Sequence, residues 1–382
     1  MTLAFWILLA LVVYVYAGYP LLLTILRAVG GSRPVRVGSG EPPVTLIVSA
    51  FNEAGVIAGK LENCLALDYP RAVLQVIVVS DASDDGTDEV VAGFADRGVE
   101  LLRMADRGGK TLGLNAAVQM ARGEVVVFSD ANAMYGRDVL RRLVRNFADP
   151  AVGAVVGEST YVNPEVESER SEGLYWRYET TIKRLESALG SVVGGDGAIY
   201  AIRRALYVPM RADALSDFVN PLQIVQAGHR CVYEPEARSY ERAADNFDKE
   251  FRRKVRIVNR AWRALLRLKA LLNPLRYGLF SFQLISHKLL RWLVPLFLAS
   301  LFVVNLAVLG RHSIYRIALA GQLVFYLLAF AGYLARHRAS LPALLSIPYY
   351  FCLVNLASAL GILDAFRGKT YTTWATARTP GN

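Results

Sequence analysis

Two kinds of hydrophobic pattern alternate along the chain. Four long stretches are almost entirely apolar, and each is long enough to cross a bilayer as a helix: residues 3–26, 292–309, 317–335 and 341–363. After the first stretch, short apolar runs rich in β-branched residues alternate with segments whose apolar positions recur at helical spacing. Such alternation predicts a mostly parallel sheet with helices on both faces. The pattern therefore predicts an α/β domain with transmembrane helices at both ends.

The spacing of the apolar residues predicts where each strand and helix lies. The apolar runs predict strands at residues 44–50, 74–80, 99–104, 124–129 and 152–157. Helical spacing predicts helices at residues 54–67, 86–97, 111–121, 137–147 and 165–190. The chain then divides into an N-terminal transmembrane helix (1–28), a linker rich in glycine and proline (29–43), the α/β domain (44–246), basic amphipathic interfacial helices (247–286), about three C-terminal transmembrane helices (287–364) and a tail (365–382).

The segment 247–272 combines apolar residues at helical spacing with lysine and arginine at most of its other positions. A basic amphipathic helix of this kind lies in the membrane interface, with its cations towards anionic lipid. A solvated charged face of a soluble helix is the alternative. The apolar stretches that follow at once favour the interface.

Charge around the first apolar stretch indicates the orientation of the chain. Residues 1–6 carry no lysine or arginine, whereas Arg27, Arg33 and Arg36 follow the stretch. A cleaved signal peptide, the competing interpretation, requires a basic start and a shorter apolar core. The positive-inside rule then places the α/β domain in the cytoplasm. We expect an integral protein of a bacterial inner or plasma membrane.

The side of the membrane on which the tail lies is left open by the sequence. Three C-terminal crossings from a cytoplasmic domain put the tail outside. Yet basic residues, which favour the cytoplasmic side, occur in the tail at Arg367, Lys369 and Arg378. Pro342 and Pro348 allow a broken or re-entrant last stretch, which would return the tail to the cytoplasm.

Composition narrows the class of protein. Of 382 residues 54% are hydrophobic, the mean hydropathy is +0.30 and the net charge is +10. The chain is therefore too apolar for an ordinary soluble protein and too charged for a bundle of membrane helices alone. The positive charge gathers near the apolar stretches, which indicates contact with membrane lipids. We expect no nucleic-acid partner, because no basic and aromatic recognition module accompanies the charge. Three scattered cysteines and four widely separated histidines argue against a histidine-based zinc site.

Candidate chemistry lies at the ends of the expected strands. Asp130 ends the run 124–129, and Asn132 follows two positions later. Ligands of an open parallel sheet bind at the carboxyl ends of its strands, and oxygen donors suit a hard divalent cation that also contacts phosphates. An Asp that caps the next helix is the alternative. The same edge should hold further polar residues, namely Asn52 and Glu53 after Ala50, Asp81, Lys110 and Asn115.

Together these residues resemble the nucleotide-sugar half of a membrane-bound family 2 glycosyltransferase, an inverting enzyme with the Rossmann-like GT-A fold. Phe51-Asn52-Glu53 is similar to that family's first strand turn, Asp81 with Gly86-Thr87 to its uracil loop, and Asp130-Ala131-Asn132 to its Asp-x-Asp motif. Lys110 and Asn115 are similar to its Gly-Lys…Leu-Asn element. The layout resembles hyaluronan, chitin and cellulose synthases. The resemblance implies a nucleotide-sugar donor, by the family default a UDP-sugar, bound by Ala50, Asn52, Glu53, Asp81, Lys110, Asn115 and Asp130. It also implies Mg²⁺ or Mn²⁺ held by Asp130 and Asn132.

The resemblance extends to the acceptor side. Residues 193–204 resemble the family's glycine-bearing acceptor loop, which implies that Gly195, Asp196 and Gly197 contact the acceptor. Glycine permits the close approach of backbone to a sugar there. Leu215-Ser216-Asp217-Phe218 matches the position at which the family has its catalytic base, so Asp217 is expected to take that role. A simple helix cap is the alternative.

Two departures from the family pattern affect the details. The second acidic residue of the metal motif is replaced by Asn132, which removes one negative charge beside the cation. The processive synthases carry Gln-x-x-Arg-Trp, whereas this chain has Arg256 and Arg260 one helical turn apart, followed by Trp262. Both arginines are expected to reach a diphosphate. Trp262 either lines an acceptor channel or is an interfacial aromatic residue.

Three functional hypotheses remain open from the sequence. The first is an inverting enzyme that adds sugars to a growing polysaccharide or other glycan at the membrane. The second is an enzyme that adds one sugar to a polyprenyl phosphate or another lipid-linked acceptor. The third is a membrane-anchored binding protein whose active site has decayed, supported by Asn132 and by the single acidic residue at Ser216-Asp217.

Overall fold

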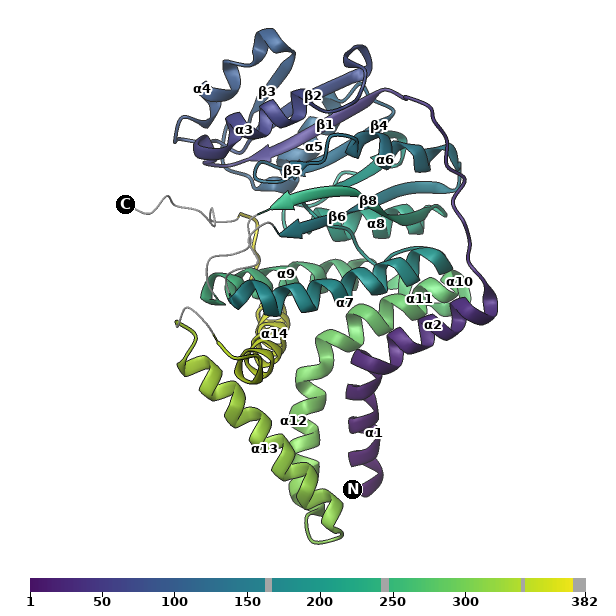
Figure 1. Cartoon of the computed structure of the whole chain (residues 1–382), viewed down its shortest axis with the longest axis vertical. Helices are drawn as coiled ribbons and strands as arrows, with labels where there is room; N and C mark the ends of the chain where they lie inside the picture. Colours follow the sequence, from purple (N-terminus) through teal and green to yellow (C-terminus); the bar gives the residue numbers. More distant parts are fainter. Residues whose placement is uncertain (162–166, 242–246, 338–340, 374–382) are drawn as a thin grey trace.

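The alternating segments form one eight-stranded sheet. The computed structural model describes residues 1–161, 167–241, 247–337 and 341–373. The strand order is β3-β2-β1-β4-β7-β6-β8-β5, and Figure 1 shows this sheet at one end of the molecule, with the long helices at the other. The strands are β1 Val44–Ala50, β2 Leu74–Ser80, β3 Val99–Arg103, β4 Val125–Asp130, β5 Met134–Tyr135, β6 Val152–Tyr161, β7 Tyr200–Arg203 and β8 Arg230–Glu241.

Helices cover both faces of the sheet, as the alternation predicts. They are α3 Ala54–Leu65, α4 Thr87–Ala92, α5 Lys110–Met120, α6 Val139–Val144, α7 Glu167–Leu189, α8 Ser216–Gln226 and α9 Phe247–Arg267, with short 3-10 turns at Arg71–Val73, Ala95–Arg97, Arg145–Ala148, Arg204–Leu206 and Lys269–Leu272. Successive side chains of a strand point to opposite faces. Ile47 of β1 accordingly packs in one core cluster, and Leu46 and Val48 pack in the other.

Pairing within the sheet is parallel in its first half and mixed in its second. β1 pairs in parallel with β2 and β4, and β2 with β3. β7 then runs antiparallel to β4 and β6. The predicted strands are confirmed, but β5, β7 and β8 were not predicted. β7 follows directly on the glycines of the expected acceptor loop, and the pattern of β8 is interrupted by Glu234, Pro235 and Glu236.

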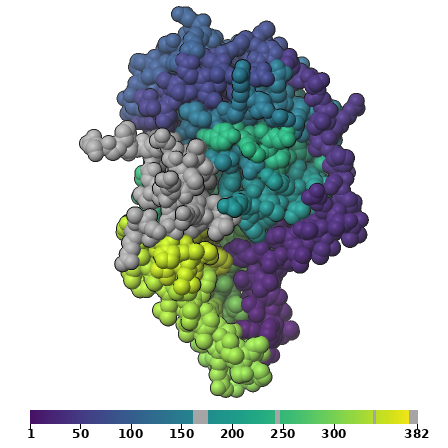
Figure 2. All heavy atoms as spheres, viewed as in Figure 1, coloured from purple at the N-terminus to yellow at the C-terminus, as the bar shows by residue number. Residues whose placement is uncertain are grey.

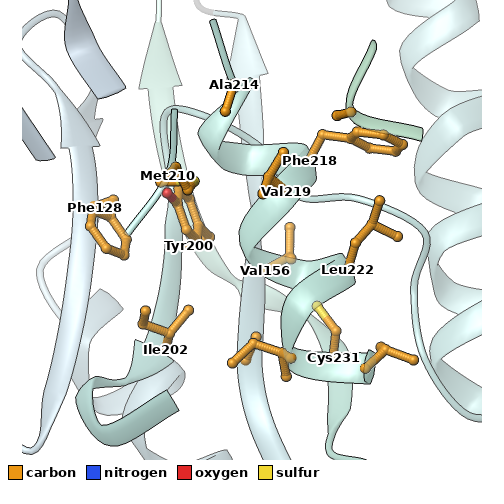
Figure 3. Close-up of a cluster of buried hydrophobic side chains, with 14 of the residues drawn as sticks. Phe128, Val156, Tyr200, Ile202, Met210, Ala214, Phe218, Val219, Leu222 and Cys231 are labelled. Carbon is orange, nitrogen blue, oxygen red and sulfur yellow. The ribbon is translucent and has the colours of Figure 1, made fainter. Parts of the chain in front are cut away.

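One core cluster joins the sheet to α8. Phe128 of β4 stacks on Tyr200 of β7, with ring centroids 4.6 Å apart. Leu222 and Val219 of α8 belong to the same cluster, and Figure 3 shows them beside Tyr200 and Cys231. This packing fixes the first turn of α8 against the carboxyl end of β4, where the expected site lies.

Both ends of the chain supply long apolar helices. The first is α1 Thr2–Val13, continued by the π-helical segment η1 Tyr14–Gly18 and by α2 Tyr19–Gly30. The second follows the short helix α10 Pro274–Tyr277 and consists of α11 Leu279–Leu284, the π-helical segment η7 Ile285–Leu289 and α12 Leu290–Val308. The third is α13 Ser313–Leu334, and the fourth is α14 Ala343–Phe366. Four helical stretches of the described chain are long and apolar enough to cross a membrane.

The apolar helices pack against one another below the α/β domain. Phe5 of α1 shares a core cluster with Leu301 and Val308 of α12 and with Tyr315 of α13. Figure 1 shows α1 beside α12 in this region, and Figure 2 shows the same segments in contact as spheres. Large apolar side chains such as Ile317 on α13 remain exposed, as expected of a surface that faces lipid.

The last apolar stretch is one continuous helix around Pro348 and not a broken hairpin. α14 packs along α9: the rings of Phe247 and Tyr349 lie 5.0 Å apart near one end, and those of Trp262 and Phe366 lie 6.0 Å apart near the other. Beyond α14, the backbone of Thr372 contacts Gly109 of the α/β domain. The described part of the tail therefore lies on the same side of the membrane helices as the α/β domain.

Candidate active site

Asp81, the residue after β2, binds the loop that precedes α5. Its carboxylate accepts hydrogen bonds from the backbone N of Gly108 at 2.8 Å and of Gly109 at 2.9 Å. Gly109 has a φ of +88°, a conformation that glycine adopts without steric cost. The Asp81 side chain is buried by this loop. Since Lys110 follows Gly109 directly, Asp81 also fixes the start of α5.

The turn after β1 is joined to the loop after β2. Asn52, in the left-handed region with a φ of +54°, donates from Nδ2 to Asp84 Oδ1 at 2.7 Å and accepts at Oδ1 from Asp84 N at 3.0 Å. Glu53 N donates to Thr87 Oγ1 at 2.8 Å, and Asp81 N donates to the Ala50 carbonyl at 3.0 Å. These hydrogen bonds join the turn after β1 to the loop after β2, so the two loops form one continuous surface.

Three charged side chains converge on Gly197. Lys110 Nζ forms an ion pair with Asp130 Oδ1 and donates to the Gly197 carbonyl at 3.2 Å. A Cβ atom added to Gly197 would lie 3.5 Å from Lys110 Nζ, 3.6 Å from Asp217 Oδ2 and 3.8 Å from Asp130 Oδ2. Glycine at this position therefore leaves open the space between the three groups. The strand-end residues and the acceptor loop thus share one centre.

Asp217 lies in the first turn of α8, partly buried. Its carbonyl accepts a hydrogen bond from Gly195 N at 2.6 Å, so the acceptor loop and the start of α8 hold each other. Burial raises the pKa of the Asp217 carboxyl, against the opposing charge of Lys110 and with a further rise from Asp196. A carboxylate with a raised pKa is a stronger proton acceptor near neutral pH.

Two more carboxyl groups adjoin this centre. Asp196 Oδ2 is buried with no hydrogen-bond partner among the described residues, and Lys183 Nζ lies 4.0 Å from it. Glu241, at the end of β8, was missed from the sequence because β8 itself was not predicted. Burial first, and then Asp196 and Asp130, raise the pKa of Glu241 to about 8. The sequence signal that could have identified Glu241 is an acidic residue at the carboxyl end of a strand, as at Asp130.

The two predicted arginines of α9 differ in their surroundings. Arg260 is buried and donates from Nη2 to the Ala214 carbonyl and to Thr111 Oγ1, the latter at 3.0 Å. It thereby ties α9 to the residue after Lys110 and to the loop before Asp217, and burial lowers its pKa to about 10. Burial, followed by the nearby Arg253, also lowers the pKa of Arg256.

Two predicted site residues lie away from the centre. Asn115 donates from Nδ2 to the Met210 carbonyl at 2.7 Å and accepts at Oδ1 from Tyr207 Oη at 2.7 Å. It therefore holds the loop between β7 and α8. Trp262 packs edge-on against Trp292 of α12, with ring centroids 6.4 Å apart, in the core cluster that includes Phe218. Its ring joins α9 to the membrane helices beneath Asp217.

The turn after β4 carries the expected metal ligands. Asp130 ends β4, Ala133 N donates to the Asp130 carbonyl at 3.2 Å, and Asn132 lies between them. Lys60, which is fully buried, holds this turn from behind by donating to the Ala133 carbonyl. Within the described ranges, no three His, Cys, Asp or Glu side chains are grouped so as to hold an ion by themselves.

Comparison with known proteins finds a family match for the part of the chain that contains Asp81, Lys110 and Asp130. Residues 45–207 match the family model described as glycosyl transferase family 2. The chain is 24% identical over 277 residues to the poly-beta-1,6-N-acetyl-D-glucosamine synthase of Staphylococcus aureus, and the match covers 65% of both chains. It is 36% identical over 118 residues to the beta-monoglucosyldiacylglycerol synthase of Trichormus variabilis, over 30% of this chain and 25% of that enzyme. The matches thus span less than two thirds of either relative.

The fold has a solved counterpart of the same extent. A mannosyltransferase from Pyrobaculum calidifontis, solved in complex with GDP-Man and Mn²⁺, superposes with a TM-score of 0.73. The superposition covers 96% of this chain and 99% of that one, at 24% sequence identity. The α/β domain therefore has the GT-A fold that the resemblance implied, with apolar helices at both ends. Residues 45–207 thus match glycosyl transferase family 2, within a chain that has the GT-A fold.

Proposed function

We propose that the chain transfers a sugar from a nucleotide-diphosphate sugar to a glycan at the membrane surface, with inversion at the anomeric carbon. The convergence of Lys110, Asp130 and Asp217 on the open position at Gly197 carries the proposal. It puts a cation, a group able to share a metal ion and a proton acceptor around one point, where we propose that the sugar is transferred. The relatives that match over part of the chain, a polysaccharide synthase and a glycolipid synthase, support this class of reaction.

In the proposed reaction the donor lies along the carboxyl ends of β1, β2 and β4. The loops joined by Asn52 and Asp81 would bind the nucleoside, for which uridine is our expectation. The bond from the anomeric carbon to the diphosphate breaks, and the diphosphate leaves with the electron pair. Lys110 would stabilise the growing negative charge, and Arg256, which has no ion pair among the described residues, would add a second cation.

The acceptor would approach past the loop 193–197 from the membrane side. Lys288 of η7 lies beside Gly194, and the ring of Phe218, next to Asp217, lies 5.9 Å from Trp292 of α12. The acceptor hydroxyl attacks the anomeric carbon from the face opposite the diphosphate, and Asp217 accepts its proton. One displacement inverts the anomeric centre, so an α-linked donor gives a β-linked product.

A divalent cation fits the residues at the end of β4. Asp130 and Asn132 supply the carboxylate and amide oxygens that Mg²⁺ and Mn²⁺ prefer. Asp196, Asp217 and Glu241 add acidic groups near Lys110, and one Asp196 oxygen has no hydrogen-bond partner among the described residues. We propose that Asp130 and Asn132 hold the ion together with the donor phosphates. Such an ion would neutralise charge on the leaving diphosphate.

A single transfer to a lipid-linked acceptor is the second candidate. Phe218 contacts Trp292 of α12, and Trp262 of α9 contacts Phe366 of α14. An acceptor bound beside Asp217 would therefore lie close to the apolar helices. This placement suits a lipid-linked substrate as well as a growing chain.

Product length separates the two candidates. The full chain in lipid nanodiscs is incubated with radiolabelled UDP-sugars, and the products are divided into water-soluble and lipid-extractable fractions and run on a gel. A ladder of lengthening water-soluble products supports glycan extension. One lipid-extractable product of fixed size favours the single transfer. Absence of labelled product with every donor would contradict both.

A further inference from the structure

A buried hydrogen-bond cluster lies between the membrane helices and the acceptor loop. Its centre is Glu186 of α7, whose side chain is fully buried. Tyr19 Oη donates to Glu186 Oε1 at 2.6 Å, and His287 Nδ1 lies 2.7 Å from the same oxygen. Val193 N donates to Glu186 Oε2 at 3.1 Å. Both carboxylate oxygens are therefore bonded, which a buried carboxylate requires.

These three partners come from separate parts of the chain. Tyr19 begins α2 of the N-terminal membrane segment, and His287 lies in η7, between α11 and α12. Val193 begins the acceptor loop. Tyr19 and His287 are themselves almost inaccessible to solvent. Glu186 is thus the point at which two membrane segments and the acceptor loop meet.

The bond to Val193 lies two residues from the bond to the proposed base. Gly195 N donates to the Asp217 carbonyl at 2.6 Å, and only Gly194, with a φ of +95°, separates the two bonded amides. Consecutive glycines give this loop more conformational freedom than any other residue pair would. The loop therefore depends on fixed points at its ends to hold Gly195 and Asp217 in place.

We propose that Glu186 is a positioning residue for sugar transfer, and that Tyr19 of the N-terminal membrane segment holds it in place. A continuous series of contacts runs from Tyr19 to Glu186, along residues 193–195, and to the backbone of Asp217. The N-terminal membrane segment is then part of the catalytic architecture as well as an anchor. The inference rests on the proposed role of Asp217 as the base.

The proposal makes a graded prediction for three variants of the full chain. Tyr19→Phe removes one hydroxyl and keeps the ring, and we expect kcat to fall about 5-fold, the size of one lost hydrogen bond. Glu186→Ala removes the fixed point, and we expect a fall on the order of 100-fold, as for a small misplacement of a reacting group. Glu186→Gln keeps an oxygen for Val193 N and should retain more activity than Glu186→Ala. The KM for the donor should stay unchanged in all three.

Tyr178→Phe is the matched control. Tyr178 Oη donates to the Tyr16 carbonyl at 3.0 Å and accepts from Arg291 Nη2 at 3.3 Å. It therefore also joins α7 to the N-terminal membrane segment, and neither of these partners belongs to the loop 193–197. Thermal unfolding of each variant in nanodiscs measures stability, and transfer of labelled sugar measures kcat and KM. We expect Tyr178→Phe to keep its kcat even where its unfolding temperature falls as far as that of Tyr19→Phe.

The outcomes separate this inference from the proposed function. If Tyr19→Phe and Tyr178→Phe lower kcat equally, or if Glu186→Ala transfers sugar at the rate of the unaltered chain, the positioning role is wrong. Asp217→Asn is measured in the same assay. If Asp217→Asn retains transfer, the proposed base is wrong. If it loses transfer while the Tyr19 and Glu186 variants keep it, only the positioning inference is overturned.

Discussion

Replacing Asp217 by Asn tests the proton-accepting step directly. The amide has nearly the volume of the carboxylate but does not accept a proton at neutral pH. The hydrogen bond from Gly195 N goes to the backbone carbonyl of Asp217, so the loop keeps this contact in the variant. A positioned general base contributes about 10²- to 10⁴-fold to a rate. We therefore expect Asp217→Asn to lower kcat by about that factor and to leave donor affinity nearly intact.

The pH dependence of the unaltered chain gives a second readout of the same group. Burial raises the pKa of Asp217, Lys110 opposes the rise, and Asp196 adds to it. A protonated carboxyl cannot accept the proton of the acceptor hydroxyl, so transfer should decline as the pH falls through this pKa. The decline should centre above the usual Asp value of about 3.9. Asp217→Asn should show residual activity without this decline.

The assay combines transfer of labelled sugar with donor binding measured by calorimetry, on the full chain in nanodiscs. Asp213→Asn is the control, because Asp213 lies in the loop before α8 and its carboxylate pairs with Arg263 and Arg267 outside the centre. That variant should be less stable but should keep its kcat. Transfer by Asp217→Asn within about 10-fold of the unaltered rate would fall below the smallest expected contribution of a base and would refute the reasoning. Joint loss of transfer and donor binding would identify Asp217 as structural.

Three further predictions concern the surroundings of the centre. The pKa of Glu241 is raised from 4.5 to about 8. Between these two pH values the folded chain keeps a proton on Glu241 that the unfolded chain has released, so the free energy of unfolding falls as the pH rises from 4.5 to about 8. Glu241→Gln should therefore unfold at a higher temperature than the unaltered chain at about pH 9 and at a similar temperature at about pH 4; equal temperatures at both would contradict the assignment. Gly109→Ala places a Cβ against the backbone of Thr372 at a φ of +88° and should cost about 1 kcal/mol or more of stability, with faster proteolysis of the tail; an unchanged cleavage rate would exclude the contact in solution. Removal of divalent cations by a chelator should abolish transfer, Mg²⁺ or Mn²⁺ should restore it, and Asp130→Asn should raise the cation concentration needed; transfer unaffected by the chelator would contradict a metal-assisted reaction.

The parallel half of the sheet could be predicted because the burial of its strands is visible in the local sequence. β1, β2 and β4 are buried on both faces, so each appears as an uninterrupted apolar run that ends at a polar residue. β7 and β8 gave no such signal. β7 has four residues, and β8 has polar side chains and a proline in its middle. Their positions depend on pairing with β4 and β6, distant in the sequence.

The candidate site was predictable to the extent that strand ends share one edge. Lys110 and Asp130 do meet there, and Asp217, which was expected from the family resemblance alone, lies beside them. The role of Asn115 in holding the 207–210 loop depends on contacts 92 and 95 residues away, which neither periodicity nor motif spacing indicates. Glu186 gave no signal either, since a Glu in a charged helical segment is usually exposed.

The central claim is that the loops around Lys110, Asp130 and Asp217 bind an activated sugar and release its nucleotide. The most direct measurement incubates the full chain in nanodiscs with a panel of nucleotide sugars and divalent cation, and follows nucleotide release together with sugar incorporation. We predict release from at least one donor, matched by labelled product and lost in Asp217→Asn. Absence of release with every donor, or equal release by Asp217→Asn, would contradict the account.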